Sequence, residues 1–213
     1  MMMRPMTATD NAPIEFKRVL PLPSTGQAPK IMHFCAIVII CARFPYRLNS
    51  KFMAETLLFS KTADRKTIYD EIIPQIESLV SGESDTIANL ANIGAVLKEA
   101  FDFFWVGFYI RRADQLILGP FQGPVACTRI GFDEGVCGHA YQTRQTVIVP
   151  NVDEFPGHIA CATASKSEIV VPIFDRSEAV FGVLDVDSDK LSDFDKTDAD
   201  GLGRIVEIVQ RII

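Results

Sequence analysis

The sequence predicts an α+β domain in which a mainly antiparallel sheet carries packed helices. Two observations lead to this prediction. Helical hydrophobic periodicity occurs at the beginning and at the end of residues 53–213, and short hairpin-like turns join the strand-like segments between them. Hairpin turns connect antiparallel neighbours, whereas a doubly wound parallel sheet needs a crossover between successive strands. At 213 residues, 48% of them hydrophobic, the chain can bury one good core.

Residues 1–52 differ from the rest of the chain. Residues 1–30 are rich in proline and poor in periodic apolar positions, so we expect them to be disordered. The apolar segment 31–42 is shorter than the roughly 20 residues that a membrane span needs. It also follows a polar leader, unlike a signal peptide, and is interpreted as a core strand or a non-native extension, with an organellar or membrane-associated leader as the alternative. We therefore assign residues 1–52 to an extension and residues 53–213 to the domain.

Two helices are expected at the start of the domain. Apolar residues recur at helical spacing over 67–79, where Pro74 indicates a kink or a division into two pieces. A second helix reaches about Ala100, and Ser84 or Asp85 is the expected N-cap. Both helices are interpreted as scaffold for the core.

Aromatic and β-branched residues favour a strand over 103–112. A turn at Ala113-Asp114 leads back into a partner strand over 115–118, which Gly119-Pro120 is expected to end. The 17-residue connection 151–167 has little pattern, and loops of that length inside compact domains are usually functional. The other expected elements are a short helix over 135–143, strands over 146–149, 168–174 and 179–187, and a final helix over about 195–213.

Three cysteines, Cys127, Cys137 and Cys161, lie in loop-like segments rich in glycine, proline, serine and threonine, and none forms a C-x-x-C pair. Any one of them alone is more often an inert buried thiol. Three thiols around one pocket could instead run a redox cycle, in which one attacks, another resolves and a disulfide forms. Cys137 begins a predicted helix, where backbone amides favour the thiolate.

Acidic and aromatic residues gather on the predicted strands. Asp185 and Asp187 are two positions apart, so both carboxylates point to one face and raise each other's pKa. Antiparallel pairing brings Glu168 to the same end of the sheet. Such carboxylates can bind an ammonium group or act as a general acid, and the alternative is a solvated strand end. Trp105 and Tyr109 share a face and form either a pocket wall or ordinary core packing.

Composition excludes several classes of protein. The net charge of −6 and the absence of a basic stripe argue against nucleic-acid binding, and no Lys/Arg-rich amphipathic helix indicates membrane binding. Five cysteines without a dense framework argue against a secreted disulfide scaffold and favour reduced thiols in the cytoplasm, with the nucleus as the alternative. A zinc site built from Cys137, His139, His158 and Cys161 is disfavoured, because its C-x-H pair is too tight.

From about Met53 to Ile213 the chain resembles the free methionine-(R)-sulfoxide reductases, which are single GAF domains. The matching motifs are WVGFY at 105–109, LGPFQGPVACTRI at 118–130, GVCG at 135–138, FPGHIAC at 155–161, SEIVVPI at 167–173 and GVLDVDS at 182–188. The departures from the family pattern at Gly131, His139 and Ala162 touch neither the thiols nor the carboxylates. The resemblance does not cover residues 1–52.

The resemblance implies a role for each candidate residue. Cys161 is implied as the nucleophile that attacks the sulfoxide sulfur, Cys127 as the main resolving thiol and Cys137 as an additional resolving or recycling thiol. The substrate-binding residues that it implies are Trp105 and Tyr109 as pocket walls, and Glu168, Asp185 and Asp187 as carboxylates for the ammonium group and the sulfoxide oxygen.

The implied reaction reduces free methionine sulfoxide to methionine through a sulfenic acid and an intramolecular disulfide, which thioredoxin reduces. One of the three carboxyl groups supplies the proton, and no metal or organic cofactor is required. A homodimer is expected from relatives with this fold. The alternative is a GAF sensor that binds a small molecule without catalysis, although a sensor has no need of three loop thiols.

Overall fold

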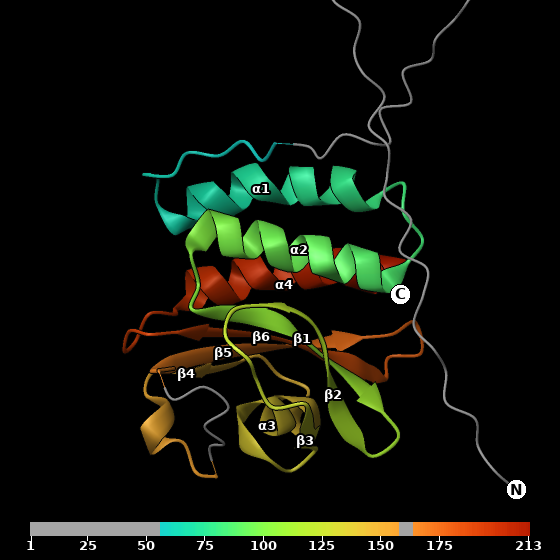
Figure 1. Cartoon of the computed structure of the whole chain (residues 1–213), viewed down its shortest axis with the longest axis vertical. Coiled ribbons are helices and arrows are strands. Elements are labelled where there is room, and N and C mark those ends of the chain that lie inside the picture. Colours follow the sequence, from blue (N-terminus) through green and yellow to red (C-terminus); the bar gives the residue numbers. More distant parts are fainter. Residues whose placement is uncertain (1–55, 158–163) are drawn as a thin grey trace, which may run out of the picture. The chain divides into compact units, whose positions relative to one another are not determined.

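The computed structural model describes residues 56–157 and 164–213, which lie in one compact unit, Phe52–Ile213 (Figure 1). Among these residues, no helix is both long and apolar enough to cross a membrane.

Three long helices begin at aspartate caps. Helix α1 (Arg65–Val80) follows Asp64, whose carboxylate accepts a hydrogen bond from the amide of Thr67. Helix α2 (Thr86–Phe101) follows Asp85 in the same way, which confirms one of the two expected caps. Helix α4 (Lys196–Ile212) begins with a capping box formed by Asp195 and Asp198. Pro74 lies inside α1, which remains one helix, so the division into two pieces was wrong.

Six strands form one sheet in the order β3-β2-β1-β6-β5-β4, and every neighbouring pair is antiparallel. This arrangement confirms the α+β prediction. The strands are β1 (Trp105–Arg112), β2 (Gln115–Gln122), β3 (Arg129–Gly131), β4 (Val147–Val149), β5 (Ser167–Phe174) and β6 (Val180–Ser188).

Two details of the sheet differ from the sequence-based expectation. Strand β2 runs through Gly119 and Pro120 to Gln122, because these two residues form a β-bulge opposite the single residue Phe108 of β1. At a bulge the proline does not have to donate a backbone hydrogen bond to the neighbouring strand. The expected end at Gly119-Pro120 was therefore wrong. Strand β3 was missed, since its three residues carry no alternating pattern.

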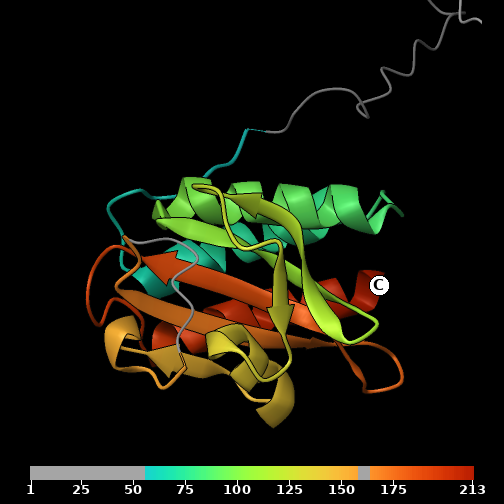
Figure 2. The same ribbon diagram turned by 60° about the horizontal axis from the view of Figure 1, so that its bottom comes forward.

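The sheet separates two layers of side chains (Figure 1). Helices α1, α2 and α4 cover one face, and the short helix α3 (Gly135–Thr143) covers the other, as the turned view in Figure 2 also shows. Alternate residues of β1 divide between them: Val106, Phe108 and Ile110 enter the large core under the three long helices. Trp105 and Tyr109 point to the α3 face and belong to a second, smaller cluster.

The two ends of the connection between β4 and β5 are joined to each other. The amide of Val152 donates to the carbonyl of Lys166 at 3.0 Å, and Lys166 Nζ lies 3.9 Å from an oxygen of Asp153. The 3₁₀ helix η2 (Val152–Glu154) starts the connection, and residues 158–163 lie outside the described residues.

Candidate functional site

Strand register aligns the candidate residues on the α3 face. Glu168 of β5 pairs with Asp187 of β6, and Asp187 pairs with Trp105 of β1, so these side chains form one row across three strands. In the next row, Asp185 pairs with Gly107 of β1. The hairpin pairing that the sequence predicted therefore brings three carboxylates and an aromatic ring to one end of the sheet.

Glu168, Asp185 and Asp187 form what we call the acidic cluster. Glu168 and Asp185 are each only 6% exposed, and Asp187 is partly buried. Among the described residues, no lysine, arginine or histidine forms an ion pair with them. The Oδ1 atom of Asp185 is buried and has no hydrogen-bond partner in that part of the chain. The cluster thus holds three carboxyl groups in buried surroundings without a compensating cation from the described protein.

Burial raises the pKa of each carboxyl group in the acidic cluster, and repulsion by neighbouring carboxylates adds to this for Glu168 and Asp185. Burial raises the pKa of Glu168 well above its ordinary value, and the charges of Asp185 and Asp187 raise it further. Burial, followed by the charge of Asp187, does the same for Asp185. Burial raises the pKa of Asp187 to about 6, although a hydrogen bond from Ser165 opposes the change. The cluster therefore retains protons at a pH where exposed carboxyl groups have lost them.

Cys137 lies beside this cluster, in the first turn of α3. Its Sγ atom and one carboxylate oxygen each from Glu168 and Asp185 lie within 4.8 Å of one another. This is the one set of three or more metal-ligating side chains in the described ranges, and its sulfur and oxygen donors differ from the Cys/His set weighed from the sequence. The Cys137 side chain is buried and His139 is exposed, so these two residues do not face one site.

Burial and the nearby carboxylates raise the pKa of the Cys137 thiol, which is 3% exposed. A thiol in that state is a poor nucleophile and a better hydrogen-bond donor to Asp185.

Three stacked rings form an aromatic wall next to the cluster. The Trp105 ring lies 5.9 Å from Tyr109 and 5.4 Å from Phe121, measured between centroids. Gly107 makes room for the indole, because a Cβ at that position would be 2.5 Å from Trp105 Cη2. Hydrogen bonds fix both polar tips: Trp105 Nε1 donates to the Pro124 carbonyl at 3.1 Å, and the Tyr109 hydroxyl donates to the Cys127 carbonyl at 2.9 Å. The wall is therefore rigid.

The three candidate cysteines have different surroundings. Cys127 is half-buried and disulfide-bonded, whereas Cys137 is free. Cys161 lies outside the described residues, as does His158 of the zinc alternative.

Sequence reasoning missed two residues of this region, Phe121 and Ser165. Phe121 was placed beyond the expected end of its strand, and only the bulge brings it against Trp105. Ser165 stands in a run of small polar residues that reads as ordinary loop, yet its hydroxyl donates to Asp187 Oδ1. No local pattern indicates either contact.

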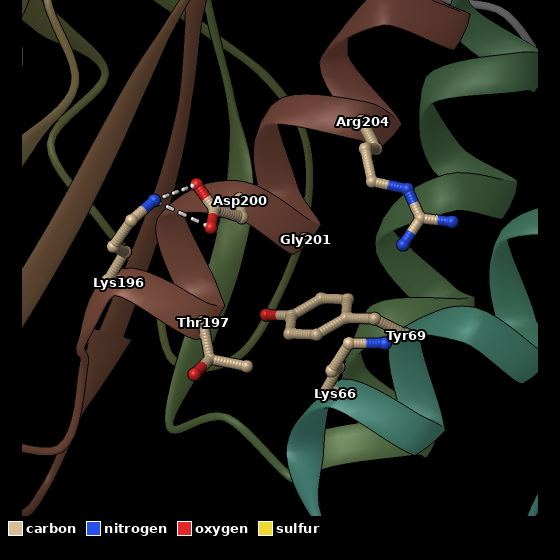
Figure 3. A pocket seen from close by; sticks show the side chains of 7 residues that line it. All are labelled: Lys66, Tyr69, Lys196, Thr197, Asp200, Gly201 and Arg204. Carbon is tan, nitrogen blue, oxygen red and sulfur yellow. Dashed lines mark hydrogen bonds and ion pairs between the residues drawn. The ribbon is translucent and has the colours of Figure 1, made fainter.

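A hollow of about 260 Å³ lies between α1 and α4, on the other face of the sheet from the acidic cluster (Figure 3). Its cations are already paired with carboxylates. Lys196 lies 2.8 Å from Asp200, and Lys66 and Arg204 each lie 2.6 Å from Asp70. This hollow shares no residue with the acidic cluster.

Comparison with known proteins places the chain in a family. A family model described as GAF domain matches residues 83–213. GAF domain-containing protein A of Dictyostelium discoideum is 53% identical over 158 residues, which make up 74% of this chain and 99% of that protein. The free methionine-R-sulfoxide reductase of Saccharomyces cerevisiae is 37% identical over 166 residues, 74% of this chain and 92% of that protein.

A solved structure extends the comparison to three dimensions. The X-ray structure of free methionine-R-sulfoxide reductase from Neisseria meningitidis in complex with its substrate superposes with a TM-score of 0.72 at 52% identity. The match covers 75% of this chain and 95% of that one.

Proposed function

The chain belongs to the GAF domain family, with free methionine-R-sulfoxide reductases among its relatives, and on this premise we propose that it reduces free methionine-(R)-sulfoxide to methionine. The observation that carries the proposal is the acidic cluster. Three carboxyl groups lie together beside a rigid aromatic wall, and no cation of the described protein pairs with them.

A ligand with a free ammonium group suits this site. The ammonium group would neutralise part of the buried negative charge and give the orphaned Asp185 oxygen a hydrogen-bond donor. Methionine sulfoxide within a peptide has an uncharged amide in place of the ammonium group, so the cluster would reject it. The aromatic wall suits the methyl and thioether part of the side chain.

The chemistry requires a proton donor and a nucleophile. We assign the proton for the sulfoxide oxygen to one of Glu168, Asp185 and Asp187, because their raised pKa values keep protons in the cluster near neutral pH. We assign the attack on the sulfoxide sulfur to the Cys161 thiolate. Oxygen passes to the Cys161 sulfur, which becomes a sulfenic acid, and methionine leaves in the thioether state.

We propose that Cys127 then attacks the sulfenic acid, which releases water and forms a disulfide with Cys161. The disulfide-bonded state of Cys127 supports its role as the main resolving thiol. Cys137 is buried and free, which supports only an additional resolving or recycling role for that thiol. An external dithiol, for which we propose thioredoxin, reduces the disulfide and becomes oxidised. The net reaction converts methionine sulfoxide and a dithiol into methionine, a disulfide and water.

This cycle needs a reducing compartment, so we place it in the cytoplasm. We also propose that residues 53–213 form the complete catalytic domain and that the enzyme is a homodimer.

Consumption of NADPH in the presence of thioredoxin and thioredoxin reductase tests the proposal. Free methionine-(R)-sulfoxide should be turned over, whereas the N-acetylated compound, which lacks the ammonium group, should not. Cys161→Ser should abolish turnover. The matched control is Cys35→Ser, which changes a cysteine in residues 1–52 and should leave turnover intact.

Two results would contradict the proposal. Turnover that survives Cys161→Ser would reject the nucleophile. Binding of free methionine sulfoxide without any consumption of NADPH would instead favour the GAF sensor. Mass spectrometry after one equivalent of substrate would show which sulfurs become linked.

A further inference from the structure

Ser165 lies where the long connection enters the site. It stands two residues before β5, is 6% exposed, and donates its hydroxyl to Asp187 Oδ1 on β6. The hydrogen bond joins residues 22 positions apart in the sequence. It is therefore a tertiary contact between the connection and the acidic cluster, distinct from a local turn.

Hydrogen bonds hold the chain on the C-terminal side of Ser165. The amide of the next residue, Lys166, donates to the carbonyl of Ser188 at 2.7 Å, and the carbonyl of Lys166 accepts from Val152 at 3.0 Å. One residue further, the Ser167 hydroxyl donates to the Lys190 carbonyl at 2.7 Å. These bonds hold the backbone next to Ser165 against β6 without help from Asp187, so the Ser165 side chain starts from a fixed position close to that carboxylate.

Asp187 needs such a donor because its carboxyl group is buried and no ionisable group around it in the described part of the chain carries a positive charge. Glu168 faces it from β5, Asp185 stands two residues away on β6, and Cys137 approaches from α3. Tyr109 on β1 is neutral and donates its proton to the Cys127 carbonyl. Among the described residues, the Ser165 hydroxyl is the one hydrogen-bond donor to the Asp187 side chain. Burial raises the pKa of Asp187, and the Ser165 bond acts in the opposite direction.

We propose that Ser165 is a positioning residue of this site: its hydroxyl holds Asp187 as a carboxylate, occupies Oδ1 and leaves Oδ2 for the substrate. This inference rests on the proposed function, in which Asp187 binds the substrate. It gives the members of the acidic cluster different roles. Asp187 provides the fixed negative charge, and Glu168 and Asp185, which receive no hydrogen bond from Ser165, are the groups that share protons.

The test compares two buried serines of the same segment. Ser165→Ala removes the donor to Asp187. Ser167→Ala removes a hydroxyl that donates to the Lys190 carbonyl, accepts from the Asp193 amide and, among the described residues, makes no hydrogen bond to the acidic cluster. Loss of a hydrogen bond to a charged carboxylate should raise the pKa of that group by about one to two units. Because burial raises the pKa of Asp187 to about 6, we expect the acid limb of kcat/KM for free methionine sulfoxide to have its midpoint near that pH in the wild type. In Ser165→Ala the midpoint should move up by about one to two pH units.

At pH 7 that change predicts a fall in kcat/KM of about two- to tenfold, with recovery by pH 9. Ser167→Ala should leave the midpoint in place, and Ser165→Thr, which keeps the hydroxyl, should bring it back towards the wild-type value. Should the alanine variant not fold, Ser165→Gly removes the same donor and repeats the measurement.

A second readout does not depend on turnover. The pKa of Asp187, followed by carbon NMR of the side-chain carboxyl and assigned with Asp187→Asn, should rise in Ser165→Ala and stay constant in Ser167→Ala. An unchanged Asp187 pKa and pH profile in Ser165→Ala would overturn the inference, as would equal losses in both serine variants at every pH. A raised Asp187 pKa in a protein that reduces no methionine sulfoxide would uphold the role of Ser165 and reject the proposed function.

Discussion

Replacing Asp187 with asparagine should stabilise the fold while it weakens the activity. The folded protein holds the pKa of Asp187 at about 6 against an ordinary value of 3.8. A difference of about two units corresponds to about 3 kcal/mol between the two protonation states. Asparagine removes the charge and keeps an acceptor oxygen for the Ser165 hydroxyl. We therefore expect Asp187→Asn to raise the free energy of unfolding by about 3 kcal/mol at pH 8, or about 6–12 °C in Tm.

The sign of this effect depends on pH. Because the folded state binds the Asp187 proton more tightly than the unfolded state does, ionisation of Asp187 destabilises the fold above its folded pKa of about 6. At pH 4 the folded state is protonated at Asp187 and the unfolded state is about half protonated, so most of the advantage of asparagine should disappear. Urea unfolding of both proteins at pH 8 and pH 4, under reducing conditions, measures the difference. A destabilised variant at pH 8, or a gain that is the same at both pH values, would refute the reasoning.

Four further substitutions test other parts of the site. Gly107→Ala places a Cβ 2.5 Å from Trp105 Cη2 and should cost about 1–3 kcal/mol in urea unfolding; unchanged stability would show that the wall yields. Tyr109→Phe removes the 2.9 Å hydrogen bond to the Cys127 carbonyl, so it should cost about 1 kcal/mol and slow disulfide formation in quenched thiol assays; equal rates would exclude this role. Cys137→Ala should keep thioredoxin-dependent NADPH consumption, whereas Cys127→Ser should lose most of it; the reverse result would exchange the two thiols.

The helices and most strands could be predicted because their signals are local. Asp85 caps α2 with a side chain one residue before the helix, and that signal is visible in the sequence itself. The end of β2 could not be predicted in this way. Gly119 and Pro120 are strong turn residues, and only pairing with β1 converts them into a bulge within a longer strand. Local propensity was outweighed there by a contact between strands.

The same distinction applies to the site. The common face of Asp185 and Asp187 follows from the two-residue period of a strand, and Glu168 joins them through a hairpin whose turn is visible in the sequence. Ser165 reaches Asp187 only because the backbone of a long connection is fixed at both ends. The pairing of adjacent strands can be predicted from the sequence pattern, but a contact made by a loop residue becomes visible only in the folded structure.

The alternation of apolar and acidic residues in β6 also bears on how the sheet assembles. Val186 enters the large core, and its neighbours Asp185 and Asp187 face the opposite side. Sliding β6 by one position against β1 would bury two charges among hydrocarbon side chains and expel a valine and a leucine from the core. The two aspartates therefore make a shifted pairing of β6 with β1 unfavourable during folding. The residues proposed to bind the substrate thus also help to set the register of the sheet.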